Sequence, residues 1–217
     1  MQTLHCEQGS QEWMEARAGI ATASEFHRII TPVHGTLSDG AESYINELIA
    51  ERIAGVDPDE ADHFVSKQMR HGHMLEPKAR AQYMFDTDHE VTTVGFVVAD
   101  DPLFGFSPDG LIGEEGGLEL KCPDLKQHVA YVRAGGLPKK YRPQVHGSLA
   151  LSGRDWWDFG SYAGWGMPLH LVRVTPDVYT RKVSDALKHF RDRFDKAIDP
   201  FRSFIENPVP EDLETPF

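Results

Sequence analysis

A short amphipathic segment in the middle of the chain constrains its fold more than any other feature. In residues 118–122, Leu-Glu-Leu-Lys-Cys, apolar and charged side chains alternate. Because side chains along a strand alternate between its two faces, Glu119 and Lys121 share one face and the apolar residues take the other. The acidic turn at 107–110 and the Gly-rich turn after it can fold the two segments into a hairpin, which carries Asp109 to the same edge as Glu119. We therefore expect a strand whose back packs on the core and whose front lines a cleft.

Two carboxylates beside an ammonium suit one kind of chemistry. Carboxylate oxygens are ligands that Mg²⁺ and Mn²⁺ prefer, and a nearby lysine can contact a phosphate or an attacking water. The spacing of Asp109, then about ten residues, then Glu-x-Lys is a short motif that also arises by chance. On the residues alone, a metal-dependent hydrolytic centre and a chance occurrence both stay open.

The rest of the pattern predicts a mixed α/β protein. Helices are predicted over 11–17, 22–30, 41–54, 66–85, 125–134, 141–151 and 177–198. Strands are predicted over 91–99, 103–106, 156–163 and 170–174. Thr22 and Glu25 have the spacing of a capping box at the start of the second helix, and Pro77 is expected to kink or restart the fourth.

Length and composition limit the class of protein. A chain of 217 residues without repeats or a long linker suits a single domain over 1–217. Its acidic tail, from about residue 207, is expected to be flexible. No stretch approaches ~20 apolar residues and the N-terminus lacks the features of a secretory signal, so we expect no membrane span and no export. Cys6 and Cys122 are too few for a disulfide framework or a metal cluster, which favours reduced thiols in a cytoplasmic protein.

The net charge of −12 argues against DNA binding over a broad open surface. That objection weakens if DNA enters a narrow, locally basic channel, because a distant charge is screened beyond roughly 10 Å. Basic residues do gather, at Lys67 and Arg70 and between positions 126 and 142.

A second candidate site lies near the N-terminus. A helix that starts at Thr22 offers free backbone N–H groups and the positive end of its dipole, which together suit a phosphate. Arg17 and Ser24 flank this position. The alternative is a capped surface helix beside a solvated arginine.

His71 and His73 lie two positions apart on a predicted helix, so their side chains diverge and do not suit a shared metal.

Longer strings carry a family resemblance. Residues 107–111, Ser-Pro-Asp-Gly-Leu, and 117–123, Gly-Leu-Glu-Leu-Lys-Cys-Pro, closely resemble the phage-lambda-type exonucleases, or YqaJ-type viral recombinases, of the PD-(D/E)XK nuclease superfamily. Residues 17–25 are similar to the string R-x-G-[IV]-x-T-A-S-E of that family. The resemblance implies a restriction-endonuclease-like fold, with a mixed, twisted sheet and helices on both faces.

The resemblance also implies roles for individual residues. Asp109, Glu119 and the backbone carbonyl of Leu120 would hold one Mg²⁺, for which Mn²⁺ can substitute, and Glu76 would help to hold a second ion. Lys121 would orient or deprotonate the attacking water and stabilise charge on the phosphate. For Glu76, which matches the family's G-x-x-x-E-x-x-A spacing, a solvated helix face remains the alternative.

Other implied positions contact the DNA end or support the centre. Arg17 and Ser24 would bind the 5′-phosphate, with Ser107 as a further candidate. Gln144 matches a glutamine on a helix that faces the catalytic lysine, and otherwise it caps a helix or is solvated. Many members have Gln-x-Gln there, whereas this chain has His146 at the second position, so that position is in doubt.

The implied function is a Mg²⁺-dependent 5′→3′ exonuclease that degrades one strand of linear duplex DNA to 5′-mononucleotides and leaves a 3′ strand for recombination by annealing. The family forms a ring-shaped homotrimer and works beside a single-strand annealing protein, which implies a phage or prophage protein in the bacterial cytoplasm. Two alternatives stay open: a PD-(D/E)XK endonuclease in DNA repair, and a non-catalytic protein that binds DNA ends as a scaffold.

Overall fold

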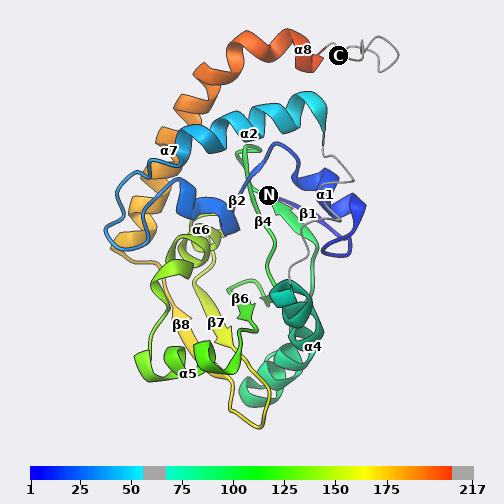
Figure 1. Cartoon of the computed structure of the whole chain (residues 1–217), viewed down its shortest axis with the longest axis vertical. Helices are drawn as coiled ribbons and strands as arrows, with labels where there is room; N and C mark the ends of the chain where they lie inside the picture. The colour runs from blue at the N-terminus through cyan, green and yellow to red at the C-terminus, as the bar shows by residue number, and fades with distance from the viewer. Residues whose placement is uncertain (56–66, 207–217) are drawn as a thin grey trace.

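The computed structural model describes residues 1–55 and 67–206, with the backbone alone over 67–73 (Figure 1). The acidic tail expected from about residue 207 lies outside this range. So do the side chains of Lys67, Arg70, His71 and His73.

The strands form two four-stranded groups. The first has the order β1-β3-β4-β2 and contains β1 (Gln2–Leu4), β2 (Ala21–Thr22), β3 (Phe96–Val98) and β4 (Phe104–Phe106). The second has the order β5-β6-β7-β8 and contains β5 (Gly110–Ile112), β6 (Gly116–Lys121), β7 (Trp156–Ser161) and β8 (His170–Val174). Each group is mixed, because β2 runs parallel to β4 and β6 runs parallel to β7. An isolated backbone bridge links Thr92, four residues before β3, to Leu111 of β5 through hydrogen bonds of 2.9 and 2.8 Å.

Helices cover both faces of the second sheet, as expected. The helical segments are α1 (Gln11–Arg17), η1 (Ala23–Arg28), α2 (Ala41–Ala54), α4 (Lys67–Thr87), α5 (Leu125–Ala134), η2 (Lys139–Tyr141), α6 (Arg142–Ser152), α7 (Val178–Ile198), η3 (Asp199–Phe201) and α8 (Arg202–Glu206). The long helices α2 and α7 lie together at one end of the molecule, and α4 runs beside β6 (Figure 1). None of the described helices combines the length and apolar character that a membrane span needs.

The core explains why β6 presents its charged face to a cavity. Leu118 and Leu120 are buried in a cluster with Ala79 and Tyr83 of α4. On the opposite face Glu119 pairs in register with Phe159 of β7, which belongs to the main core. The predicted alternation of β6 is therefore confirmed.

Two local predictions differ from the structure. Residues 23–28 form a 3₁₀ helix, and Thr22 makes no capping hydrogen bond through its side chain. A capping box needs the backbone N–H of Thr22 for the side chain of Glu25, but that N–H donates to the hydroxyl of Tyr44 at 3.0 Å. The second prediction offered a kink or a restart at Pro77. The restart is wrong, because α4 continues through Pro77 to Thr87, and the kink stays a prediction.

Candidate active site

The hairpin of β5 and β6 brings Asp109 to the edge of β6, as predicted. Gly110 pairs with Leu118, so β6 extends beyond the end of β5. The backbone N–H of Leu120 consequently has no strand partner on this edge, and it donates to Oδ2 of Asp109 at 2.5 Å. The backbone N–H of Asp109 donates to the carbonyl of Leu118 at 3.1 Å. Asp109 is thereby fixed beside Glu119 through both its main chain and its carboxylate.

Glu119 is the most buried member of the site. Its side chain is 3% exposed, and its Oε1 lies 2.5 Å from Nζ of Lys121. The same oxygen accepts a hydrogen bond of 2.7 Å from Nε2 of Gln144, which lies in the first turn of α6. The structure therefore brings Gln144 into the predicted cluster.

The cluster carries an excess of negative charge. Burial raises the pKa of Asp109 well above its ordinary value, and the charge of Glu119 adds to this rise. Burial also raises the pKa of Glu119, although the ammonium of Lys121 opposes it. Burial alone would lower the pKa of Lys121, but the carboxylates of Glu119 and Asp109 raise it above the ordinary lysine value.

This charge distribution suits a divalent cation. Two buried carboxylates whose ionised forms are disfavoured gain most from a cation bound between them, and their oxygens are ligands that Mg²⁺ accepts. The carbonyl of Leu120 faces the same edge as its N–H, because both groups of a strand residue point to one side. The donor set of Asp109, Glu119 and Leu120 therefore fits one ion. In the described residues no group of three or more His, Cys, Asp or Glu side chains surrounds a common point, so Glu76 does not complete such a group.

A cavity of about 150 Å³ joins this cluster to the N-terminal string. Its lining includes Arg17, Ser24, Ser107, Asp109, Glu119, Lys121 and Gln144. All of these residues were candidates from the sequence, although they come from three segments that are well separated along the chain. Ser148, one helical turn after Gln144, also lines the cavity. His146 does not, because it is buried and its Nδ1 lies 2.8 Å from Oγ1 of Thr180.

Arg17 is held in a position that suits an anion. Its guanidinium lies 3.8 Å from the centre of the Trp13 ring, and Nη2 donates to Oγ1 of Thr22 at 3.3 Å. Thr22 in turn contacts the hydroxyl of Ser24 at 3.1 Å. Burial lowers the pKa of Arg17, and within the described part of the chain no carboxylate forms an ion pair with it. A partly buried cation beside two hydroxyls can bind a phosphate.

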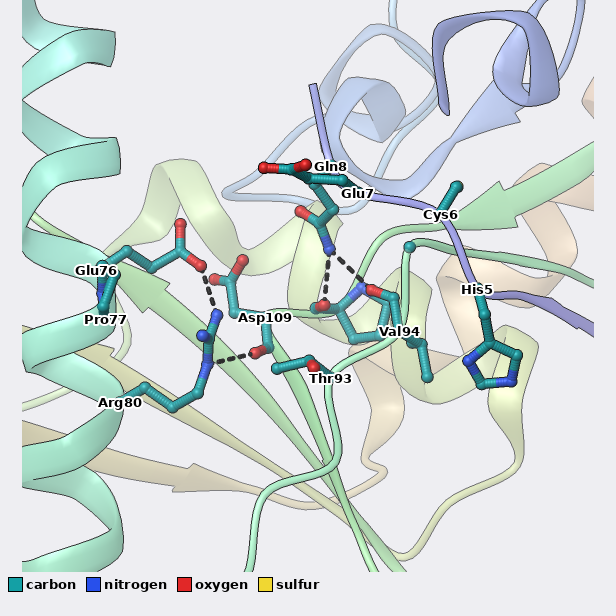
Figure 2. A pocket seen from close by; sticks show the side chains of 12 residues that line it. His5, Cys6, Glu7, Gln8, Glu76, Pro77, Arg80, Thr93, Val94 and Asp109 are labelled. Atoms are coloured by element: carbon teal, nitrogen blue, oxygen red, sulfur yellow. Dashed lines mark hydrogen bonds and ion pairs between the residues drawn. The ribbon is translucent and has the colours of Figure 1, made fainter. Parts of the chain in front are cut away.

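Glu76 does not line the cavity that contains Arg17 and Lys121. Together with Asp109 it lines a second cavity, of about 410 Å³, and its carboxylate is turned toward Arg80 (Figure 2). Nη2 of Arg80 donates to Oε1 of Glu76 at 2.5 Å, and Nε of Arg80 donates to the carbonyl of Asp109 at 3.0 Å. Gln8 lines both cavities, and its Nε2 donates to the carbonyls of Val94 and Pro108.

Arg80, Gln8 and Trp13 are site residues that the sequence did not reveal. Trp13 positions Ser107, because its Nε1 donates to the Ser107 hydroxyl at 3.0 Å. The spacing of Glu76 and Arg80, one helical turn apart, was a signal that could have predicted their ion pair. Gln8 and Trp13 belong to the site through contacts with distant segments, and the sequence carries no local signal for such contacts.

The fold and the Asp109–Glu119–Lys121 hairpin define the class of the protein: it has a PD-(D/E)XK-like nuclease fold, with a mixed sheet flanked by helices. Residues 12–155 match the YqaJ-like viral recombinase domain, and the chain belongs to this family.

Solved structures are similar over most of the chain. An alkaline exonuclease (LHK-Exo) from Laribacter hongkongensis is 30% identical, with a TM-score of 0.71 over 89% of this chain and 99% of that one. A structure of LHK-Exo in complex with dAMP matches with 29% identity, the same TM-score and the same coverage. A phage-related exonuclease from Haemophilus somnus 129PT shares the fold, with 16% identity and a TM-score of 0.61 over 84% of this chain and 96% of that one. No curated protein sequence matches.

Proposed function

We propose that this protein is a Mg²⁺-dependent 5′→3′ exonuclease that degrades one strand of linear duplex DNA. The observation that carries the proposal is the shared cavity, which places Arg17, Ser24 and Ser107 beside the Asp109–Glu119–Lys121 cluster. A terminal phosphate bound by the first group would bring the first phosphodiester of the strand to the second. The likeness to an alkaline exonuclease and membership of a viral recombinase family support a DNA exonuclease.

Each residue of the cluster would have a separate role in the hydrolysis of the phosphodiester. Mg²⁺, or Mn²⁺ in its place, would be held by Asp109, Glu119 and Leu120, with Glu76 contributing to a second ion, and would polarise the phosphate and the attacking water. The carboxylates of Glu119 and Asp109 raise the pKa of Lys121. Its amino group would orient or deprotonate the attacking water and stabilise charge on the phosphate. Gln144 fixes the orientation of Glu119.

The terminal phosphate accounts for polarity and product. Arg17 and the hydroxyls of Ser24 and Ser107 would hold the 5′-phosphate, so hydrolysis of the next phosphodiester releases a 5′-mononucleotide and leaves a new 5′-phosphate on the strand. The complex of LHK-Exo with dAMP supports a mononucleotide product.

The partners follow from the family. The proposal includes a homotrimeric ring that encloses the DNA, which would reconcile a net charge of −12 with a locally basic channel. It also includes a single-strand annealing protein that takes over the exposed 3′ strand. As a viral recombinase, the protein would belong to a phage or prophage and act in the bacterial cytoplasm.

One nuclease assay tests the proposal. Linear duplexes labelled at either the 5′ or the 3′ end, with 5′-phosphate or 5′-hydroxyl termini, are incubated with and without Mg²⁺ beside a closed circle. We expect early release of the 5′ label as mononucleotide, from linear DNA alone and fastest from phosphorylated ends. Cutting of the circle would instead identify an endonuclease. Binding of ends without cleavage in any divalent metal would identify a scaffold protein.

A further inference from the structure

Arg80 connects two of the candidate metal ligands. It lies on α4, one helical turn after Glu76, and donates through Nη2 to the Glu76 carboxylate at 2.5 Å. It also reaches across to the turn before β5, where its Nε donates to the carbonyl of Asp109 at 3.0 Å. Figure 2 shows the guanidinium between the two acidic residues, at the wall of the larger cavity.

These contacts differ from those of an ordinary surface ion pair. The side chains of Arg80 and Glu76 are 22% and 28% exposed, so both are largely withdrawn from solvent. The guanidinium is planar and its donors point in fixed directions, which lets two simultaneous hydrogen bonds set both distance and orientation. Arg80 therefore fixes α4 relative to the turn that carries Asp109.

The main-chain contact has a consequence for the Asp109 carboxylate. Asp109 is held at its N–H by Leu118, at its carboxylate by Leu120 and at its carbonyl by Arg80. The first two contacts come from β6 and the third from α4. Without Arg80 the turn keeps its anchor on β6 but loses the one that relates Asp109 to Glu76.

We propose that Arg80 is a positioning residue of the carboxylate centre, which sets the Asp109 and Glu76 carboxylates at a fixed separation for divalent cations. This inference rests on the proposed function, because it assumes that both residues hold metal. Arg80 acts through these two residues and need not touch the DNA.

A purely electrostatic role for Arg80 makes the opposite prediction. If Arg80 only balanced the negative charge of Glu76, its removal would leave the site with a larger net negative charge, and the affinity for a cation would rise. If Arg80 sets geometry, removal lowers the affinity, because partners that orient metal ligands contribute about 10- to 100-fold. Arg80→Lys keeps the charge and removes the planar fork, so it isolates the geometric contribution.

The experiment is titration calorimetry of Mn²⁺ into the full chain without DNA, for the wild type, Arg80→Lys and Arg80→Ala. Arg191→Lys is the matched control. Arg191 also bridges an acid one turn away on its own helix, Asp195 at 2.9 Å, and a residue on a distant turn, Asp101 at 2.8 Å, but it lies outside both cavities. Thermal unfolding in EDTA tests each variant for an intact fold.

We expect both Arg80 variants to bind Mn²⁺ about tenfold more weakly or worse, with Arg191→Lys equal to the wild type. The unfolding midpoint of Arg80→Lys in EDTA should match that of Arg191→Lys. Wild-type affinity in Arg80→Lys, or tighter binding in Arg80→Ala, would overturn the positioning role while leaving the nuclease proposal intact. A wild type that binds no Mn²⁺ would overturn both.

Discussion

The ammonium of Lys121 lies 2.5 Å from the carboxylate of Glu119, two residues before it on the same face of β6. The ammonium opposes the rise that burial causes in the pKa of Glu119, and the carboxylate raises the pKa of Lys121. In the proposed function the ammonium would contact the phosphate while the carboxylate would hold the metal ion.

Replacement of Lys121 by alanine should abolish cleavage and retain binding to DNA ends. The loss of one positioned cation in a site of this kind lowers the rate by about 10²- to 10⁴-fold. Single-turnover cleavage and a filter-binding assay in Ca²⁺ measure the two properties separately. Lys188→Ala is the control, since Lys188 is 79% exposed and pairs with Asp185 on α7. Wild-type turnover in Lys121→Ala would exclude the role given to Lys121.

Replacement of Asp109 by asparagine should remove metal binding and stabilise the metal-free fold. Asparagine is nearly the same shape and its side-chain oxygen can still accept the N–H of Leu120, while the charge that burial and Glu119 disfavour is gone. We expect the Mn²⁺ affinity to fall by at least the roughly 10- to 100-fold that the loss of a partner orienting a ligand costs, and the unfolding midpoint in EDTA to rise. Calorimetry and thermal melts measure the two effects. An unchanged Mn²⁺ affinity would contradict the assignment of Asp109 as a ligand.

The raised pKa values of Asp109 and Glu119 predict how the stability of the metal-free protein depends on pH. Between the ordinary carboxyl pKa, about 4, and the raised folded values, the folded state binds more protons than the unfolded state. The free energy of unfolding therefore falls as the pH rises through this window, and it levels off above the folded values.

Thermal melts in EDTA across a pH series measure this effect. We expect the fall in the wild type to be smaller in Asp109→Asn and to disappear when excess Mn²⁺ is present, because both changes relieve the charge. Equal slopes for the wild type and Asp109→Asn would show that the carboxylate cluster does not control this dependence.

The central hairpin could be predicted because its signals are local. The alternation over residues 118–122 fixes which side chains share a face, and the turns before it fix where Asp109 lies. The structure confirms both. The proximity of Arg17 to this hairpin could be predicted only through the family resemblance, since no local pattern relates the two segments.

The parts that could not be predicted depend on contacts with distant backbone groups. Arg80 binds the carbonyl of Asp109, and Gln8 binds those of Val94 and Pro108. A carbonyl is present at every residue, so such a contact leaves no trace in the sequence. The capping box at Thr22 failed for a related reason, because the hydroxyl of Tyr44 takes the N–H that the motif needs.

Replacement of Arg17 by alanine should reduce the preference for phosphorylated over hydroxyl 5′ ends. A hydrogen bond to a charged group contributes about 1.5–3 kcal/mol, so the ratio of the two cleavage rates should fall about tenfold or more. Arg17→Lys should recover part of the preference, because the positive charge remains. The recovery should be incomplete, because lysine lacks the planar guanidinium that stacks on Trp13. Arg28→Ala is the matched control: Arg28 stacks on Tyr44 at 4.3 Å and pairs with Glu47 at 2.8 Å, but it does not line the cavity. An unchanged ratio in Arg17→Ala would remove Arg17 from the phosphate site. A reduced ratio in Arg28→Ala would show that the preference comes from general positive charge near the DNA end rather than from a defined pocket.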